Sequence, residues 1–454
     1  MIISPRLPEI KGLLPRFRWD SLVGRHLRAM VIGILCHCGR MTAQQAASAV
    51  TGDSRHRGTL GRFLARHGGR LARLNVRAAE RLLRHEGRRG RYVLIVDATN
   101  VTHQSERLEN STSTGNRQRR HCRQARYSKR RHAPKRFHAS VWGLLLTPDG
   151  KRIPFHRGFR TRAYCQAQKL DFRSHADLAA EMIRALPLPA GADVVVLGDT
   201  AFESKQLRAA CAQRGYVWIA PANAERVLNG EKPRPRLWSL VASFTPSQFA
   251  LVRLDPNTGK YAARRRRSLS RHESKNSCRT FYVHEEKRNV HSLGETRIVF
   301  STKQLEASGE LLKRERTKLL LTNAERLTTA EIVELYLLRW QIELFFKELK
   351  SELGMHQYRF RDWNRVNAWL EAYCFTMLYL EALRARRMRD KRLTPKQRAL
   401  WKRLRTHGLL TAVRAELELA QIEELQRATQ TKTGLRKLRK KLDQAQPKEY
   451  RTTA

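Results

Sequence analysis

The sequence predicts an α/β fold in which a strand-rich core is flanked by helical regions at both ends. Two short runs, Tyr92–Val96 and Val194–Leu197, consist mainly of Val, Ile and Leu, which is typical of buried central strands. The terminal regions show instead the apolar spacing and the capping residues of helices. At 454 residues, the chain is long enough for about two to four domains with a substantial hydrophobic core.

Residues 1–88 are predicted to be all helical. Helices are expected from Leu22 to Cys38, from Thr42 onwards and from Thr59 to Arg66. Short helices that carry many arginines favour a DNA-binding domain of the helix-turn-helix kind. A small bundle that only covers the core is the alternative.

Residues 89–220 are expected to form the first part of the core. The strand that leads into Asp97 is followed by a basic loop from Gly115 to Arg136, with ten Lys or Arg and no acid. The elements expected after this loop are, in order, a strand over Phe137–Leu146, a turn at Thr147–Gly150, a returning strand over Lys151–Arg157, a helix over Leu170–Leu186, a strand over Asp193–Leu197, a helix over Glu203–Gln213 and a strand over Gly215–Ala220.

Residues 221–326 are predicted to form a mostly β insertion before the helices resume. Its expected strands lie within Leu237–Leu254, Thr280–His284 and Thr296–Ser301. Residues 327–390 form the second part of the core, with one long helix around Glu343 and another over Trp363–Arg387. Residues 391–454 are basic and helical, and both dimerisation and DNA contact stay open for them.

Each of the two apolar runs leads into an acid. Asp97 follows Val96 directly, and Asp199 follows Leu197 after one glycine. A strand that is buried on both faces gains little from an aspartate unless the carboxylate stands at the strand end, in a cleft. Both aspartates are therefore predicted to project into a functional site. A phosphatase with an aspartate nucleophile is disfavoured, because it would want an Asp-x-Asp pair and position 99 is Thr99.

A third acid comes from the segment YLLRWQIELFFKELK, residues 336–350, which is predicted to lie on one long helix. At about 100° per residue, one stripe of roughly 60° holds four of its polar side chains, namely Tyr336, Arg339, Glu343 and Lys350. Glu343 is the one acid that this stripe selects. The flanking cations favour phosphate binding near a scissile bond, and Lys347 is a weaker DNA-binding candidate on the same stripe.

Three carboxylates together suit metal-assisted phosphodiester chemistry. Asp97, Asp199 and Glu343 could converge on a pair of divalent cations, which activate water and stabilise a leaving oxygen. Hard carboxylate ligands favour Mg²⁺, with Mn²⁺ as a substitute. The same three acids are therefore the predicted catalytic residues and the predicted metal ligands.

These residues resemble the DDE transposases of bacterial insertion sequences, in the group with a Y-x2-R-x3-E-x6-K signature. The match to the catalytic acids and to the signature runs, in chain order, through Asp97, Asp199, Tyr336, Arg339, Glu343 and Lys350, and it covers roughly residues 90–385. The resemblance implies a ribonuclease H-like catalytic core. It also implies metal-dependent cleavage and transfer of DNA strands, binding to the terminal inverted repeats of a mobile element, and a homodimer in the synaptic complex.

One further feature of that group concerns tryptophan. Some members are thought to stack a flipped base on a tryptophan of the insertion when a DNA hairpin forms. Trp238 is the only tryptophan of residues 221–326. Base stacking and core packing both stay open for it.

Charge and cysteine usage point to a nucleic-acid partner in a reducing compartment. The formal net charge of +49 predicts a polyanionic partner, and 41% hydrophobic residues argue against a histone-like coat. Seven scattered cysteines include no Cys-x2-Cys pair, and Cys36-His37-Cys38 lacks the spacing of common zinc sites. The first residues form no secretory signal and no apolar stretch is long enough to span a bilayer, so a cytoplasmic, nucleoid-associated bacterial protein is expected.

Two other functions remain open on the sequence. A ribonuclease H-like DNA nuclease that cuts without rejoining would keep the three acids but would not need to recognise terminal repeats. A domesticated DNA-binding protein would be expected to have lost at least one acid, whereas this chain has all three.

Overall fold

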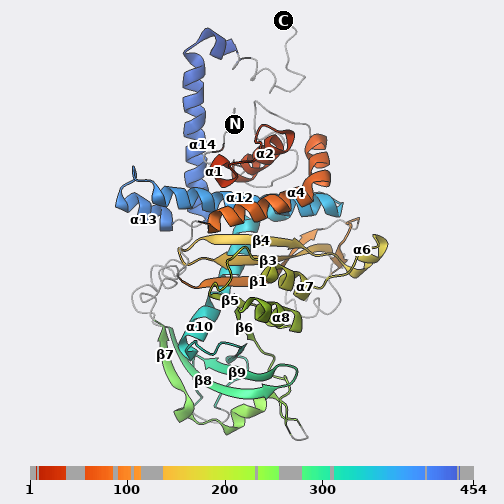
Figure 1. The fold of residues 1–454 in the computed structure, drawn as a ribbon, viewed down its shortest axis with the longest axis vertical. Helices are drawn as coiled ribbons and strands as arrows, with labels where there is room; N and C mark the ends of the chain where they lie inside the picture. The colour runs from red at the N-terminus through yellow and green to blue at the C-terminus, as the bar shows by residue number, and fades with distance from the viewer. Residues whose placement is uncertain are drawn as a thin grey trace, which may run out of the picture.

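The computed structural model describes residues 7, 10–36, 57–84, 90–103, 107–113, 136–230, 234–254, 279–306, 311–403, 406–436 and 439. Within these residues, ten strands form one mixed sheet, and helices pack on it (Figure 1). No helix of this described part is long and apolar enough to cross a membrane. The mixture of helices with a mixed sheet agrees with the predicted α/β class.

The core strands follow the predicted order. They are β1 (Tyr92–His103), β2 (Thr112–Ser113), β3 (Arg136–Leu146), β4 (Arg152–Gly158), β5 (Val194–Leu197) and β6 (Val217–Pro221). β1 lies between an antiparallel β3 and a parallel β5, and β6 runs parallel to β5. β4 and the short β2 pair antiparallel with β3. The apolar runs of β1 and β5 therefore lie side by side at the centre of the sheet, as their composition predicted.

The sequence predicts that β1 ends at Asp97, and this prediction is wrong. The strand continues to His103, and Asp97 lies opposite Trp142 of β3. Thr99 and Thr102 are β-branched, and such side chains suit a pleated, half-buried surface, so the strand outlasts its apolar run. Asp97 thus projects from the middle of a central strand.

The segment 221–326 extends the core sheet. Its strands are β7 (Ala250–Leu254), β8 (Arg279–Val290), β9 (Gly294–Thr302) and β10 (Lys318–Thr322). They form an antiparallel meander, and β10 also pairs with β6. The predicted strands over Thr280–His284 and Thr296–Ser301 are confirmed as parts of β8 and β9. The predicted strand over Leu237–Leu254 is confirmed only for its last five residues, which are β7, and is wrong before them, where η4 (Leu237–Ser243) and η5 (Pro246–Gln248) are 3₁₀ helices.

Three helices connect the core strands: α6 (Arg162–Ala167), α7 (His175–Arg184) and α8 (Lys205–Arg214). α7 begins later than the predicted helix at Leu170, because Ser174 caps it. The Ser174 side chain accepts from the backbone N–H of Asp177, whose carboxylate accepts from the backbone N–H of Ser174. α8 ends near the predicted point, at Gly215, whose φ of 66° is a left-handed cap that suits glycine.

Helices from both ends of the chain cover one face of the sheet (Figure 1). The N-terminal helices are α1 (Ile10–Leu13), α2 (Leu22–Cys36) and α4 (Arg57–Leu83), and those after residue 360 are α12 (Trp363–Arg389), α13 (Pro395–Arg403) and α14 (Thr406–Thr429). α4 extends well past the predicted end at Arg66 and packs along α12. Asn75 of α4 donates to Glu371 of α12 at 2.6 Å, and His156 Nδ1 of β4 lies 2.9 Å from the same carboxylate. A buried polar network thus joins α4, α12 and β4.

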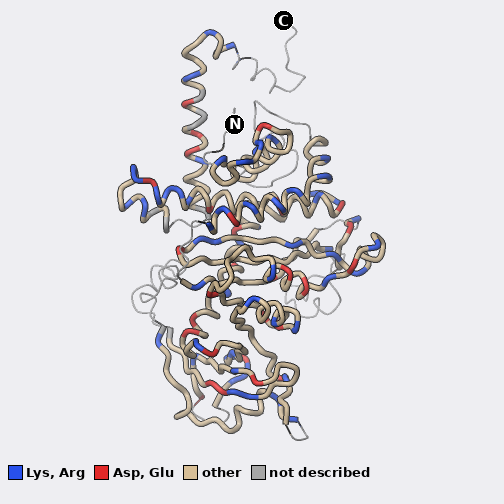
Figure 2. Tube along the Cα trace, in the orientation of Figure 1, with Lys and Arg blue, Asp and Glu red and all other residues tan. Residues whose placement is uncertain are grey.

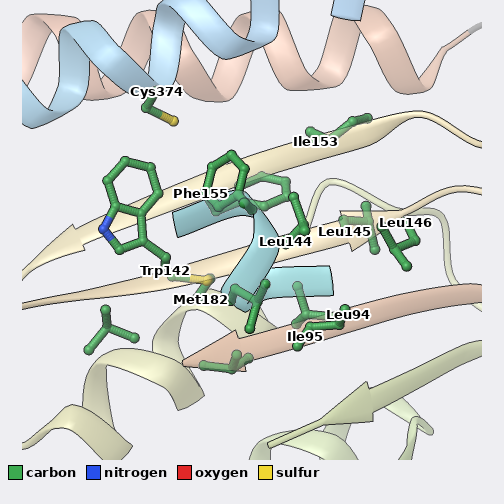
Figure 3. Close-up of a cluster of buried hydrophobic side chains, with 14 of the residues drawn as sticks. Leu94, Ile95, Trp142, Leu144, Leu145, Leu146, Ile153, Phe155, Met182 and Cys374 are labelled. Atoms are coloured by element: carbon green, nitrogen blue, oxygen red, sulfur yellow. The ribbon is translucent and has the colours of Figure 1, made fainter. Parts of the chain in front are cut away.

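The hydrophobic core lies where β3 is covered on both sides (Figure 3). Trp142, Phe155 and Met182 are among its buried side chains. Gly143 of β3 lies against this cluster, because an added Cβ there would stand 2.3 Å from the sulfur of Met182. Close packing of this kind fixes the distance between the sheet at β3 and the helix that packs on it.

Four predictions fall outside the described residues. They concern the helix after Thr42, the basic loop over residues 115–135, the part of the insertion over residues 255–278 and the basic region beyond residue 439. Of the Cys36-His37-Cys38 motif, only Cys36 is described, as a free cysteine.

Candidate active site

The predicted long helix around Glu343 is divided into three pieces. These are α10 (Thr329–Leu337), α11 (Trp340–Lys347) and the π-helical turn η6 (Glu348–Glu352). Between the first two, the backbone N–H of Arg339 bonds to the carbonyl of Tyr336 at 3.0 Å, an i to i+3 contact. A 3₁₀ turn rotates more per residue than an α-helix and a π turn rotates less. The apolar spacing in the sequence is that of a regular α-helix, so it indicates neither the 3₁₀ contact at Arg339 nor the π-helical turn.

Arg339 lies between two of the predicted catalytic acids. Its Nη1 is 3.7 Å from Oδ2 of Asp97, and its Nη2 donates a hydrogen bond to the carboxylate of Glu343. β1 and α11 are thereby joined at the site, although the two acids are 246 positions apart in sequence (343 minus 97). We call Asp97, Asp199, Glu343 and Arg339 the carboxylate site.

Asp199 enters this site from the turn that follows β5. Its Oδ1 accepts the backbone N–H groups of Ala201 at 2.9 Å and Phe202 at 3.2 Å, so it caps the short turn η3 (Thr200–Phe202). Gly198 leaves room for this turn, since an added Cβ there would lie 3.0 Å from the Cβ of Phe202. The predicted position of Asp199 at a strand end is confirmed.

The charges of the three acids influence one another. The pKa of Asp97 is raised to about 6. Burial is the largest cause, the negative charges of Asp199 and Glu343 add to it, and the backbone N–H of Ala98 and the Arg339 guanidinium act in the opposite direction. Burial raises the pKa of Tyr336 to about 12, again with contributions from Asp199 and Glu343. Tyr336 therefore keeps its proton, and the structure brings it to the same site.

Among the described residues, neither lysine of the predicted stripe forms an ion pair with these acids. Lys350 Nζ donates to the carbonyl oxygen of Asn100 on β1 at 3.0 Å, and burial lowers the pKa of this lysine. Lys347 is exposed. Arg339 therefore contacts Asp97 and Glu343, whereas Lys350 is held on β1 by the carbonyl group of a residue three positions beyond Asp97.

The metal prediction was tested against this geometry. Within the described part of the chain, no group of three or more His, Cys, Asp or Glu side chains is gathered closely enough to hold an ion. The donors nevertheless fit a hard cation in chemistry, because the site offers carboxylate oxygens. Arg339 supplies the positive charge between Asp97 and Glu343. Burial is the largest cause of the raised pKa of Asp97, and the neighbouring charges of Asp199 and Glu343 contribute less.

Trp340 is a candidate that the sequence analysis missed. It directly follows Arg339, and 56% of its surface is exposed. On an ideal helix Trp340 falls about 40° from Tyr336 and away from the apolar face. This position beside the polar stripe is a sequence signal by which it could have been identified. Trp238, in contrast, is partly buried against the core.

Two family models match the chain over the segments that contain these residues. Residues 171–380 match a model described as a transposase DDE domain, which includes Asp199 and Glu343. Residues 20–239 match a DDE superfamily endonuclease model, which includes Asp97 and Asp199. These matches support a DDE transposase. Such enzymes act on DNA and generally use divalent metals. No curated protein matches the chain.

Two arginines of the 221–326 segment join it to the elements that carry the acids of this transposase-like site. Arg226 pairs with Glu203, which directly follows the Asp199 turn, and Glu203 also pairs with Arg208 of α8. Arg297 of β9 donates to the carbonyl oxygen of Leu327, just ahead of α10. The extended sheet therefore contacts both the Asp199 turn and the start of the helix that leads to Glu343.

Replacing Glu203 with Ala is expected to lower the free energy of unfolding by about 3 kcal/mol, because two partly buried arginines lose their partner. The shift of the urea midpoint measures this loss. Glu225→Ala is the matched control: Glu225 also pairs with two arginines, Arg236 and Arg314, but its side chain is 38% exposed, so about 1 kcal/mol or less is expected. Equal midpoint shifts in the two variants would show that the Glu203 cluster has no special role.

Proposed function

We propose that the protein is a DNA transposase that binds the terminal inverted repeats of a mobile element and catalyses metal-dependent strand cleavage and strand transfer. The proposal is supported by Arg339, which contacts both Asp97 and Glu343, and by Asp199, whose charge contributes to the raised pKa of Asp97. The Y-x2-R-x3-E-x6-K spacing supports membership of the bacterial insertion-sequence group.

The catalytic core is proposed to be ribonuclease H-like. The central strand order β4-β3-β1-β5-β6, in which β3 alone runs antiparallel to the other four strands, supports this assignment. Residues 1–88 are proposed as the DNA-binding domain and 221–326 as an insertion in the core. The role of residues 391–454 is left between dimerisation and DNA contact.

Asp97, Asp199 and Glu343 are proposed to hold two Mg²⁺ ions, or Mn²⁺ in their place. When bound, such ions activate water and stabilise the leaving oxygen of phosphodiester cleavage. Arg339 is proposed to hold the phosphate that is cut. Tyr336, which stays protonated, is proposed to donate a hydrogen bond to a neighbouring phosphate oxygen. Lys350 and the exposed Lys347 extend this DNA-binding surface, and the ring of Trp340 offers a platform on which a base can stack.

A plasmid that carries the element with its flanking inverted repeats tests the function. With Mg²⁺, the protein is expected to release the element and join its ends to target DNA, leaving short target duplications. Cleavage at the repeats without joined products would favour the nuclease alternative. Binding without cleavage would favour a DNA-binding descendant, which the presence of all three acids argues against. Two ends must be held together, so a homodimer on paired ends is part of the proposal, and light scattering of the DNA complex tests it.

A further inference from the structure

The exposed face of α4 consists almost entirely of arginine. Over residues 58–83, the exposed positions are five arginines and Gly69, and a sixth exposed arginine directly follows the helix. The six arginines, which we call the α4 ridge, are Arg62, Arg66, Arg70, Arg73, Arg77 and Arg84. On an ideal straight helix their spacing would place them within about 80° of arc, although Figure 1 shows that α4 bends along its length. The other face of α4 is fixed against α12, so the ridge cannot turn inward.

The charge of the α4 ridge is not compensated within the described structure. None of its six guanidinium groups forms an ion pair with a described carboxylate, whereas exposed arginines elsewhere do, such as Arg236 with Glu225 and Arg392 with Asp390. Burial lowers the pKa of His67, and the positive charges of Arg70 and Arg66 lower it further. Like charges in a row repel one another unless a polyanion lies on them.

The α4 ridge runs into a cleft at its C-terminal end. A cavity of about 340 Å³ lies between α4 and the chain that follows α1. Four arginines line it against a single acid, and its lining includes Arg16, Arg77, Arg81, Arg84 and Glu80. Guanidinium groups bind phosphate oxygens in a bidentate manner, so a cleft of this composition suits a phosphate group.

We infer that the α4 ridge and its cleft bind the sugar–phosphate backbone of duplex DNA, outside the carboxylate site and without regard to base sequence. The inference rests on the proposed function and names the partner surface that the helical N-terminal region provides. A row of like cations without exposed amide or carboxylate groups between them suits the repeating phosphates of a duplex, and phosphate contacts position a protein on DNA without reading its sequence. The bound duplex is thereby held along α4 by charge.

A variant with four ridge arginines changed together, R66A/R70A/R73A/R77A, tests the inference. The slope of log K against log salt concentration is expected to become shallower by about 3 to 4, because each lost phosphate contact contributes about 0.9. The change is expected to be the same on terminal-repeat DNA and on an unrelated duplex. The matched control, R236A/R288A/R314A/R392A, removes the same charge from exposed arginines that already face carboxylates, so its slope is expected to stay near that of the wild type.

An unchanged slope in the ridge variant, or the same change in both variants, would overturn the inference. So would a loss confined to terminal-repeat DNA, because that would mean that the ridge reads sequence. The unfolding midpoint of each variant shows that the fold is kept. Wild-type cleavage of repeat DNA in the same buffer tests the proposed function separately. If the wild type cleaves while the ridge variant binds as well as the wild type, the ridge alone is refuted.

Discussion

Asp199→Ala is expected to reduce strand cleavage to below detection while leaving DNA affinity largely intact. Asp199 is held by two backbone N–H groups at the end of β5 and contributes to the raised pKa of Asp97, so its charge acts within the carboxylate site. Loss of a carboxylate ligand removes the means of holding a cation at the phosphate. Loss of the cap that Asp199 provides to a short turn costs only about 1 kcal/mol, so the protein still folds.

Single-turnover cleavage on saturating repeat DNA, with binding measured separately, tests this expectation. Asp193→Ala is the matched control, because Asp193 precedes the same strand at its opposite end and pairs with Arg91 at 2.9 Å. It is expected to cleave at the wild-type rate. If Asp199→Ala nicked DNA at near that rate, Asp199 would have no catalytic role.

Arg339→Ala is expected to lose about a hundredfold in saturated cleavage rate, because a displacement of about 1 Å at the reacting phosphate costs that much. DNA affinity is expected to change little, since Arg339 is one of 90 Lys and Arg residues and the nonspecific attraction is spread over all of them. Arg339→Lys is expected to recover little of the rate, because a lysine keeps the charge without the planar fork that contacts Asp97 and Glu343.

Cleavage at saturating DNA beside a salt-titrated binding assay separates the two effects. Arg326→Ala, an exposed arginine just ahead of α10, is the control and is expected to alter neither quantity. A variant of Arg339 that bound DNA weakly but cleaved at the wild-type rate would make the arginine an ordinary DNA-binding residue.

The sheet could be predicted from the sequence wherever a strand buries Val, Ile or Leu on both faces. β5 and the start of β1 are such strands, and both were expected. The continuation of β1 beyond Asp97 was missed, because pairing with β3, and not hydrophobicity, sustains it. The sequence predicts a strand over Leu237–Ser243, where the structure has a 3₁₀ helix. A short apolar run is compatible with either conformation, so its composition does not distinguish them.

The candidate site shows the same division. The sequence located Asp199 and Glu343, because a strand end and a helical stripe are local features. It could not show that Arg339 lies between Asp97 and Glu343, or that Lys350 bonds to the carbonyl of Asn100, because these contacts join segments far apart in the chain. The interruption of the helix at Arg339 also depends on such contacts. Local pattern therefore selects the residues, and tertiary packing decides what each one touches.

The most direct test of the central claim is the amount of Mn²⁺ bound by the protein on repeat DNA, measured from the spin-resonance signal of the free ion. The account predicts about two tightly bound ions per wild-type site. Changing the three acids to their amides, D97N/D199N/E343Q, is expected to abolish this binding, while D193N leaves it intact. Equal Mn²⁺ binding by the wild type and the triple variant would contradict the claim that these carboxylates form the metal site.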